Sequence, residues 1–281
     1  MSKKLKADVS LLAICVVWGV SYPVISLALE HVGPYTFLTM RYILASLLLF
    51  PFALRSFKMI DKKILLGGTL IGISLFLGSV FQTVGLLYTT PSKSGFLTGM
   101  NVVFVTLFVA IIYRKMPDVK SIIGVLASVI GLCLMSLDGK MGMNIGDGLT
   151  LLCAVAFAFQ ILLVSKYSKG EYLVIISYIQ MTIVGVLSLI PAIFAERLTL
   201  PINKVTIGSI VFTAIFCTIL TYMVQNKMQP YTKPTHAAII FLSEPVFSAI
   251  FSSFIGDKLT GNTLIGCAFI LLGILFINIK K

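Results

Sequence analysis

The clearest shortage in this sequence is of charge. Only 11% of its 281 residues are Asp, Glu, Lys or Arg, whereas soluble domains carry about 25%. Hydrophobic residues make up 58% of the chain, which is more apolar surface than a soluble core of this length can bury. The composition therefore excludes an ordinary soluble protein and predicts an integral membrane protein.

Acidic residues are the scarcer of the two signs, with 10 Asp and Glu against 22 Lys and Arg, and the formal net charge is +12. A basic balance is also typical of nucleic-acid-binding proteins. Here, however, the lysines stand in short clusters between long apolar runs, as they do in the cytoplasmic loops of membrane proteins. We therefore expect the lipid bilayer as a partner and no nucleic acid.

Motifs for catalysis or metal binding are also missing. The five cysteines lie inside apolar runs without C-x-x-C spacing, which favours small packed side chains over metal ligands. The sequence has no His-Glu-x-x-His, no Gly-x-Ser-x-Gly and no paired aspartates, and its hydrophilic connections are too short for a catalytic domain. We expect no enzyme, no metal and no cofactor.

What the sequence does contain is an internal repeat. Residues 88–91 read YTTP, and residues 231–234 read YTKP, 143 positions later. The pair Gly124 and Gly131 recurs 142 positions later as Gly266 and Gly273, and glycines seven apart on one helix face favour close helix packing. These matches predict a duplication, with one unit over residues 1–140 and a second over residues 141–281.

Each unit contains five apolar runs near the length of about 20 residues that a membrane-spanning helix needs. No run alternates with the period of two expected of a membrane β-barrel. The ten runs cover residues 8–29, 34–54, 63–88, 94–113, 118–137, 146–164, 172–194, 205–224, 237–255 and 259–279. The predicted fold class is an all-α integral membrane protein with ten transmembrane helices as two five-helix repeats.

The distribution of basic residues predicts the orientation. With the N-terminus in the cytoplasm, the segments on that side hold 16 Lys and Arg, those on the other side hold 5, and Arg41 lies within a helix. Because positive residues concentrate on the cytoplasmic side, we expect a multi-pass protein of the cytoplasmic (inner) membrane with both termini inside. Five is odd, so the second unit enters from the opposite side. Such inverted repeats are a transporter architecture.

Several short motifs resemble one family along the whole chain. Residues 17–24 read VWGVSYPV, residues 37–42 read FLTMRY and residues 82–89 read QTVGLLYT. FLTG follows at 96–99, SEPVF at 243–247 and GDKLT at 256–260. In this order they resemble the EamA-type family of ten-helix drug/metabolite transporters. The resemblance implies a secondary transporter and says almost nothing about its substrate.

The sequence departs from that family pattern in places. Thr106 stands where many relatives have a proline, and the turn at Arg114 and Lys115 lacks the acid that Asp257 supplies in the second unit. Small four-helix members of the superfamily couple export to protons through a glutamate in the first helix. No acid lies in the interior of the first predicted helix here, so that mechanism does not transfer.

Two ionisable side chains, Arg41 and Glu244, lie well inside predicted spans. Each would cost about 2.5–3.5 kcal/mol or more if it faced lipid, so we expect both to face the bundle interior as gating or ion-coupling residues. For Glu244 a proton or cation site and a packing acid beside Pro245 are both open. For Arg41 a packing role that ties backbone carbonyls is favoured, because its mate in the repeat, Gln180, is neutral.

Trp18 is the only tryptophan, and it lies at mid-depth rather than at the membrane interface where tryptophans gather. A buried indole N–H needs a partner, so we expect Trp18 and Tyr22 to line a cavity, with simple core packing as the alternative. Pro23 and Pro245 each remove a backbone hydrogen bond. We expect them to bend their helices and to act as gates.

Three amides, Gln82, Asn101 and Gln160, also fall inside predicted spans. Each must find a hydrogen-bond partner, either a solute in a cavity or a neighbouring helix. Both readings remain open, and all three join the candidate substrate-binding residues. His236 lies at the start of the ninth predicted helix, and we interpret it as a solvated loop residue rather than a pH sensor.

The predicted function is a secondary transporter that moves a small organic metabolite by alternating access, with export as the family's habit. Aromatics, amides and one acid suit an amino acid, an amine or a drug-like solute better than a polyphosphate, which needs several basic residues. The alternative is a membrane sensor or assembly factor that retains the transporter fold. The coupling ion, with a proton as one hypothesis, and the oligomeric state stay open.

Overall fold

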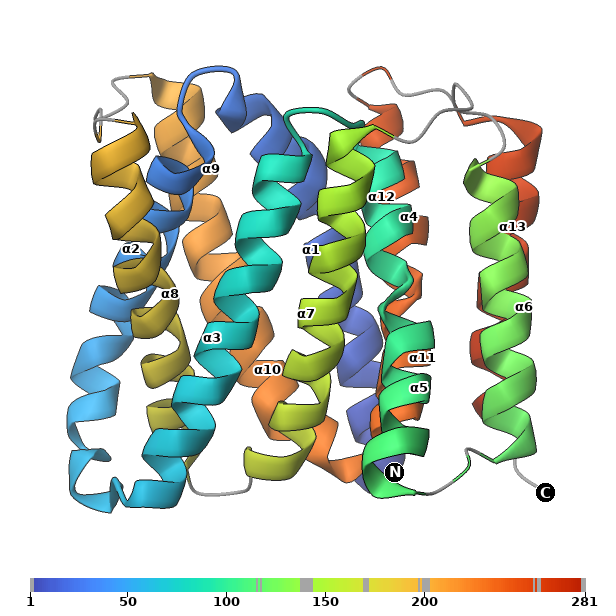
Figure 1. Ribbon diagram of the computed structural model, residues 1–281, viewed down its shortest axis with the longest axis horizontal. Helices are drawn as coiled ribbons and strands as arrows, with labels where there is room; N and C mark the ends of the chain where they lie inside the picture. The colour runs from blue at the N-terminus through green and yellow to red at the C-terminus, as the bar shows by residue number, and fades with distance from the viewer. Residues whose placement is uncertain are drawn as a thin grey trace.

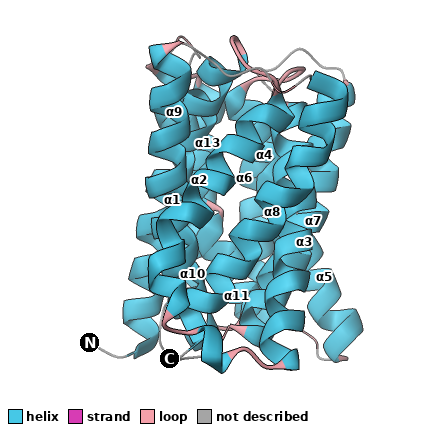
Figure 2. Cartoon of the chain, turned by 90° about the vertical axis from the view of Figure 1, so that its left-hand side faces the viewer, coloured by secondary structure: helices cyan, strands magenta, loops and turns pink. Residues whose placement is uncertain are grey.

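The computed structural model describes residues 3–114, 116, 118–136, 144–168, 172–196, 198, 203–254, 256 and 259–278. Over these residues the chain is a bundle of helices that run between two ends, and no strand occurs among them (Figure 1, Figure 2). The all-α prediction is thereby confirmed. Some features used above lie outside the described residues, namely Lys115, Leu137, Ile255, Asp257, Lys258 and Ile279.

The helices follow the predicted apolar runs closely, although three of the runs are divided. In chain order they are α1 (Lys3–Leu29), α2 (Pro34–Leu54), α3 (Lys62–Gly85), α4 (Pro91–Gly99), α5 (Asn101–Tyr113), α6 (Val119–Ser136), α7 (Ile145–Tyr167), α8 (Leu173–Glu196), α9 (Lys204–Ala214), α10 (Thr221–Met228), α11 (Pro234–Phe241), α12 (Ser243–Ser253) and α13 (Gly261–Asn278). Short 3-10 turns lie at Phe57–Met59 and Gln229–Tyr231.

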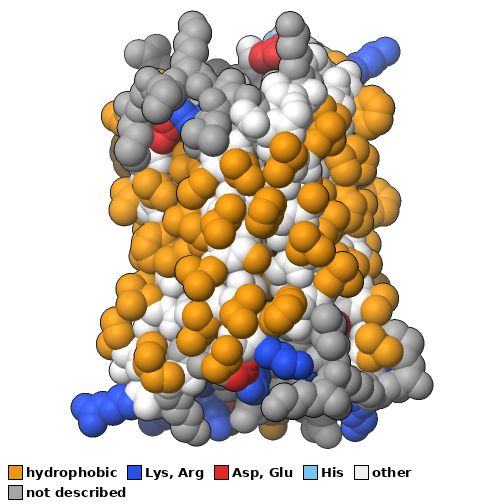
Figure 3. All heavy atoms as spheres, turned by 90° about the vertical axis from the view of Figure 1, so that its right-hand side faces the viewer, with side chains coloured by type: hydrophobic (Ala, Val, Ile, Leu, Met, Phe, Trp, Pro, Cys, Tyr) orange, Lys and Arg blue, Asp and Glu red, His pale blue; other side chains and the backbone are white. Residues whose placement is uncertain are grey.

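Within the described residues, eight helical stretches are long and apolar enough to cross a membrane. Three of these join divided helices: Pro91–Ile112, Lys204–Tyr231 and Pro234–Ser253. Two shorter apolar stretches, Val119–Leu134 and Gly261–Phe276, lie in α6 and α13. Figure 3 shows hydrophobic side chains covering the middle of one face, with charged side chains toward its two ends. These are the features of a multi-pass membrane protein.

The repeated tetrapeptide marks two helix starts. α4 begins with Pro91 after Thr90, whose hydroxyl accepts a hydrogen bond from the Lys93 N–H at 3.2 Å. α11 likewise begins with Pro234 after Lys233. Proline suits the first helical position because that N–H has no partner within the helix. α4 starts at the upper end of the bundle in Figure 1, and α11 starts at the lower end.

Two of the divided helices break in the same way. α4 gives way to α5 at Met100 (φ −60°, ψ −10°), and α11 gives way to α12 at Leu242 (φ −65°, ψ −9°). Pro245 has no N–H to donate to the carbonyl of Phe241, four residues earlier, which accounts for the second break. The predicted bend at Pro245 is therefore an interruption centred three residues before it.

The third divided helix contains a π-helical segment, Ile215–Leu220, between α9 and α10. A π-turn inserts an extra residue into the helix, so nearby carbonyls lose their regular i+4 donor, and such segments are frequent at functional sites. By contrast, Pro23 lies inside α1, which is continuous from Lys3 to Leu29.

Helices α6 and α13 pack against each other through the repeated glycines (Figure 1). A Cβ on Gly131 would lie 2.5 Å from the Gly266 carbonyl, and a Cβ on Gly273 would lie 2.8 Å from the Gly124 carbonyl. Only glycine permits this approach, and close packing is what holds helices together in lipid. The assignment of these glycines to helix packing is confirmed.

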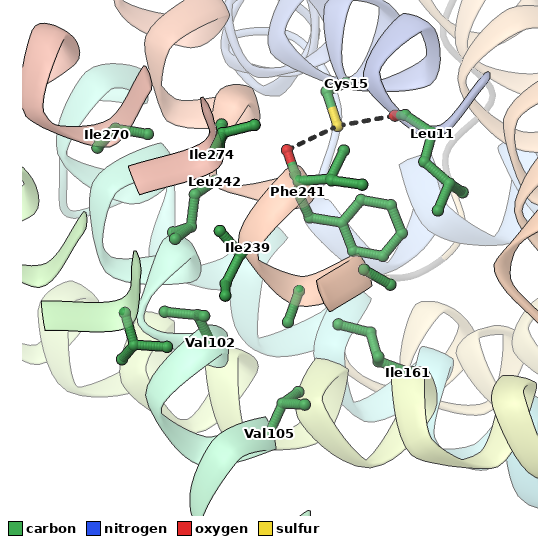
Figure 4. Packing of buried hydrophobic residues seen from close by; sticks show 14 of the residues in the cluster. Leu11, Cys15, Val102, Val105, Ile161, Ile239, Phe241, Leu242, Ile270 and Ile274 are labelled. Atoms are coloured by element: carbon green, nitrogen blue, oxygen red, sulfur yellow. Dashed lines mark hydrogen bonds between the residues drawn. The ribbon is translucent and has the colours of Figure 1, made fainter. Parts of the chain in front are cut away.

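The most deeply buried span is α11–α12. Inside the bundle, 78% of this stretch is buried, against 44–50% for the other seven long spans. Figure 4 shows Ile239, Phe241 and Leu242 surrounded by side chains from α1, α5, α7 and α13. The thiol of Cys15 donates to the Leu11 carbonyl at 3.1 Å (Figure 4). α12 also contacts α1 closely, because Gly19 leaves room for the backbone of Phe247.

Candidate functional site

A cavity lies in the middle of the bundle where the interrupted helices meet. It has a volume of about 50 Å³, and eight helices contribute to its wall: α1, α2, α3, α5, α7, α10, α11 and α12. The lining residues are Trp18, Ser21, Arg41, Tyr42, Ser79, Gln82, Thr83, Asn101, Phe157, Gln160, Ile161, Tyr222, Gln225, Phe241 and Glu244. A polar lining with one acid and one base is therefore set among aromatic rings.

The aromatic part of the wall is centred on Trp18. Its ring centroid lies 5.5 Å from that of Phe241, edge to face, and 5.7 Å from that of Tyr222. Edge-to-face and tilted contacts of this kind are favourable because ring edges are positive and ring faces negative. The wall therefore presents fixed aromatic surface to whatever enters the cavity.

The carbonyl of Cys217, in the π-helical segment, accepts hydrogen bonds from three side chains. It accepts hydrogen bonds from Trp18 Nε1 at 3.3 Å, from Arg41 Nη2 at 3.2 Å and from the Thr221 hydroxyl at 2.7 Å. Trp18 Nε1 also donates to Thr221 Oγ1 at 3.0 Å. The indole N–H therefore has the partner that its depth requires, and it ties α1 to the π-helical segment.

Arg41 is 6% exposed and contributes to the wall from α2. Besides the Cys217 carbonyl, its Nε donates to the Thr218 hydroxyl at 2.7 Å, and its guanidinium lies 5.2 Å from the centre of the Tyr42 ring. Arg41 therefore bonds to one backbone carbonyl, which belongs to the irregular part of a helix, while its role in packing or gating stays a prediction. Arg41 thus links the π-helical segment to the cavity.

Glu244 lies in the first turn of α12 and faces the cavity. Its Oε1 accepts from the Tyr22 hydroxyl at 2.8 Å, and Tyr22 in turn accepts from Gln82 Nε2 at 3.0 Å. Gln82 Nε2 also lies 3.4 Å from the Thr98 hydroxyl. This chain of hydrogen bonds joins α12, α1, α3 and α4, so the Glu244 carboxylate is connected to side chains on three other helices.

A second polar chain leads away from the cavity between α7 and α10. The amides of Gln160 and Gln225 donate to each other, both at 3.2 Å, and Gln225 also donates to Gln229 at 2.9 Å. Gln229 donates to the Ser165 hydroxyl at 2.7 Å and to the Ile161 carbonyl. Gln160 therefore does both of the things proposed for it: it lines the cavity and it joins two helices.

Asn101 is a residue of the cavity wall whose side-chain oxygen lacks a hydrogen-bond donor. It opens α5, directly after the interruption, and is 6% exposed. Its Oδ1 is buried without a hydrogen-bond partner from the protein. Because an unmatched buried acceptor costs about 1–3 kcal/mol, a donor from a solute or from water is expected to satisfy it.

The structure brings most of the predicted residues to one place. Those lining the cavity are Trp18, Arg41, Gln82, Asn101, Gln160 and Glu244. Tyr22 lies one hydrogen bond behind the wall, 1% exposed, and reaches the cavity through Glu244. Pro23 and Pro245 contribute no lining; Pro245 instead packs against Gly99, whose Cβ would lie 3.0 Å from its Cγ. Their role as gates stays a prediction.

Several lining residues were missed, and the repeat offset was the signal that could have found some of them. Gln225 lies 143 positions after Gln82, and Phe157 lies 139 positions after Trp18; all four line the cavity. His236 was misread: it is 7% exposed rather than solvated. The π-helical segment has no sequence signal that we recognise.

Comparison with known proteins gives a consistent result. The EamA-like transporter family matches residues 5–137 and again residues 144–279. A protein of Archaeoglobus fulgidus named as an uncharacterized transporter is 35% identical over 99% of this chain and 87% of its own length. A Salmonella typhimurium protein named "Probable amino-acid metabolite efflux pump" is 25% identical over 95% of this chain and 93% of its own length.

The fold also matches a solved crystal structure of a protein. The TM-score is 0.77, and the match covers 98% of this chain and 96% of the other at 15% identity. At that identity the likeness concerns the fold alone.

Proposed function

The chain belongs to the EamA-like transporter family, and we propose that it carries a small organic metabolite across the cytoplasmic membrane by alternating access. The observation that carries this proposal is the central cavity, to which α1, α2, α3 and α5 contribute from one half of the chain and α7, α10, α11 and α12 from the other. Transporters of inverted-repeat type bind their substrates near the midplane, between the repeats and beside interrupted helices.

The packing of the helices supports two inverted five-helix units. α1, α2, α3, α4–α5 and α6 would form the first, and α7, α8, α9–α10, α11–α12 and α13 the second. Under this pairing the contacts occur as related pairs: α3 on α7 with α9–α10 on α1, α1 on α12 with α7 on α5, α1 on α11 with α7 on α4, and α3 on α8 with α9 on α2. α2 on α8 and α6 on α13 are each related to themselves.

The size of the cavity supports a conformation closed around its centre. About 50 Å³ accommodates a few water molecules, whereas sites for small organic ligands enclose about 300–1,000 Å³. Substrate binding therefore requires the helices around the cavity to separate. The interruptions at Met100 and Leu242 are the places where α4–α5 and α11–α12 can bend for this, because both N–H groups bond to carbonyls three residues earlier, in turns tighter than those of a regular α-helix.

The chemistry of the wall favours an amino acid, an amine or a drug-like solute. Glu244 offers a carboxylate to an ammonium group, and Trp18, Tyr222 and Phe241 offer ring faces and edges, which attract cations and flat apolar groups. Asn101 adds an acceptor without a protein partner. The name of the Salmonella relative supports export and amino-acid-like solutes.

The orientation that we propose places both termini in the cytoplasm. α1 begins and α13 ends at the lower end of the bundle in Figure 1, and Figure 3 shows most of the visible Lys and Arg at that end. Because positive residues are retained on the cytoplasmic side, this end is the inner one.

Transport by purified protein in proteoliposomes tests the proposal. Vesicles loaded with amino acids, amines or drug-like cations should take up the labelled solute by saturable counterflow, and vesicles that contain the Glu244→Gln variant should take it up far more slowly. Glu30→Gln is the matched control, because Glu30 is an exposed acid outside the cavity. A folded protein that exchanges no solute across a broad panel would contradict transport.

A thermal-shift screen of the same solutes separates the two candidate functions. A true ligand raises the melting temperature by mass action. A solute that stabilises the protein and yet is never exchanged would support the alternative, a sensor or assembly factor that retains the transporter fold.

A further inference from the structure

Among the described residues, each end of the bundle has an acid–base pair that contains a buried acid and joins a helix start to a neighbouring helix. At the inner end, Asp8 of α1 faces His236 of α11, with 3.7 Å between Oδ2 and Nε2. Both residues are more than nine-tenths buried, at 8% and 7% exposure. The pair closes α1 against α11 at the edge of the bundle.

At the outer end, Asp147 of α7 faces Lys93 of α4, with 2.7 Å between Oδ2 and Nζ. Asp147 is 1% exposed and also accepts from the Thr89 hydroxyl at 3.2 Å and from the Asn144 N–H at 2.9 Å. This pair closes α7 against α4.

The two pairs occupy matching positions in the repeat. His236 follows Lys93 by 143 positions, the offset that relates the two tetrapeptides. Asp147 follows Asp8 by 139 positions, the offset that relates Trp18 to Phe157 in the cavity wall. The same pairing of an acid with a base therefore occurs once at each end, as a hydrogen-bonded lysine pair at 2.7 Å and as a histidine pair at 3.7 Å.

That difference decides how each end responds to protons. A lysine beside a carboxylate stays charged across the physiological range, whereas histidine changes charge between about pH 5 and pH 8. A cavity of about 680 Å³ at the inner end reaches His236 and gives it access to protons. The other charged or titratable groups around it are Lys4, Asp118, Lys120, Tyr231 and Lys233, and Lys233 is paired with Asp118 at 3.0 Å.

We propose that Asp8 and His236 form a proton-operated latch on the inner end, the counterpart of a permanently charged latch formed by Asp147 and Lys93 on the outer end. The inference rests on the proposed alternating access. When His236 is protonated it attracts the Asp8 carboxylate and holds the inner end closed. When His236 loses its proton the attraction weakens, and the inner end opens more readily toward the cytosol.

The latch makes the inner opening sensitive to cytosolic pH independently of Glu244, which lies in the central cavity. For an exporter, which loads its substrate from the cytosol, cytosolic acid then slows loading. We expect no such response at the outer end, because a lysine side chain does not ordinarily change charge in this pH range.

Hydrogen exchange of the full-length protein in nanodiscs tests the latch without any substrate. After correction for the intrinsic pH dependence of exchange, residues 3–10 and 234–240 should lose protection between about pH 5 and pH 8. We expect a loss on the order of tenfold, which corresponds to one pKa unit of coupling. Residues 91–97 and 145–150 at the outer end should show no matching change.

Exchanging the bases between the two latches sharpens the test. His236→Lys should make the inner end protected at every pH, and Lys93→His should give the outer end the pH response that the inner end has lost. Asp8→Asn removes the acid and should abolish the inner response even if His236→Lys does not fold. His31→Gln is the matched control, because His31 is the other of the two histidines and is exposed.

The outcomes separate the latch from the proposed function. Inner protection that is independent of pH in the wild type, or a pH response that survives in Asp8→Asn, would overturn the latch even in a protein that transports. A pH-dependent inner end in a protein that exchanges no solute would uphold the latch and overturn the transport proposal.

Discussion

The interrupted helices α4–α5 and α11–α12 break with similar backbone geometry but differ in how deeply they are buried. Both break at residues with nearly the same backbone angles, Met100 and Leu242. Yet α11–α12 is 78% buried and α4–α5 only 44%. Only the second break has a proline nearby, Pro245, and the first break occurs without one. The interruption therefore belongs to the architecture, and proline reinforces it in one half.

The two breaks also meet each other. Gly99, the last residue of α4, lies against the Pro245 ring, and Gly95 lies against the Ser248 hydroxyl on α12. The polar residue just beyond each break differs: Asn101 begins α5 as a neutral amide, and Glu244, the second residue of α12, is an acid. One shared scaffold thus offers the cavity two unlike groups.

The largest effect should come from the acid. Glu244→Gln keeps the shape of the side chain and removes the charge, so it cannot carry a proton or pair with an ammonium group. A hydrogen bond to a charged group contributes about 1.5–3 kcal/mol, so we expect transport in proteoliposomes to fall about 10- to 100-fold and its pH-driven part to disappear. Uptake that is still driven by a pH gradient in this variant would remove Glu244 from proton coupling.

Added side-chain volume should lower the stability equally on the two sides of the glycine contact between α6 and α13. Gly131→Ala and Gly273→Ala each place a methyl group against the opposite helix, and overpacking of this kind costs about 1–3 kcal/mol. Both variants should melt several degrees lower than the wild type in detergent. Gly148→Ala is the control, because nothing lies within 4 Å of a Cβ there. A large difference between the two variants would break the equivalence of the halves.

The amide at the first break should matter less than the acid at the second. Asn101→Leu removes an acceptor that lacks a partner in the protein, so the fold should tolerate it while the affinity for substrate falls. A neutral hydrogen bond contributes about 0.5–1.5 kcal/mol, which predicts a KM for transport raised about 2- to 10-fold. Thr106→Val is the control, because its hydroxyl bonds to the Val102 carbonyl of its own helix. An unchanged KM would exclude Asn101 from the binding site.

The smallest effect should come from the pair Asp118–Lys233, which is far more exposed than Asp147–Lys93. The Ser121 N–H and then Lys233 lower the pKa of Asp118 to about 2. Its contribution to stability is therefore complete above the unfolded pKa of about 3.9 and is lost as the pH falls toward 2. Exposed pairs contribute less than about 1 kcal/mol.

Melting curves measure this contribution. The difference in melting temperature between wild type and Asp118→Asn should be small at pH 7 and should vanish as the pH falls to about 2, where the folded carboxylate takes up its proton. A difference that grows on acidification would contradict the sign of the shift.

The sequence predicted the helical class and the positions of the apolar runs, because hydropathy in lipid is a strong signal. It also predicted six of the cavity residues. A polar side chain such as Gln82 or Asn101 inside an apolar run must face a neighbouring helix or a cavity, because it needs a hydrogen-bond partner. It did not predict the π-helical segment at Cys217, whose carbonyl accepts hydrogen bonds from Trp18 and Arg41 on other helices. His236 was misread because burial at a helix start depends on a neighbour, Asp8, that lies far away in sequence.

The central claim is that two related five-helix units lie in the membrane upside down with respect to each other. Tyr88 and Tyr231 are matched positions, 53% and 50% exposed, and they are suited to labelling. In intact cells, a membrane-impermeant maleimide should label Tyr88→Cys and should label Tyr231→Cys only after the membrane is opened, with the wild type as the background. Labelling of both variants from the same side would contradict the inverted arrangement and the alternating access built on it.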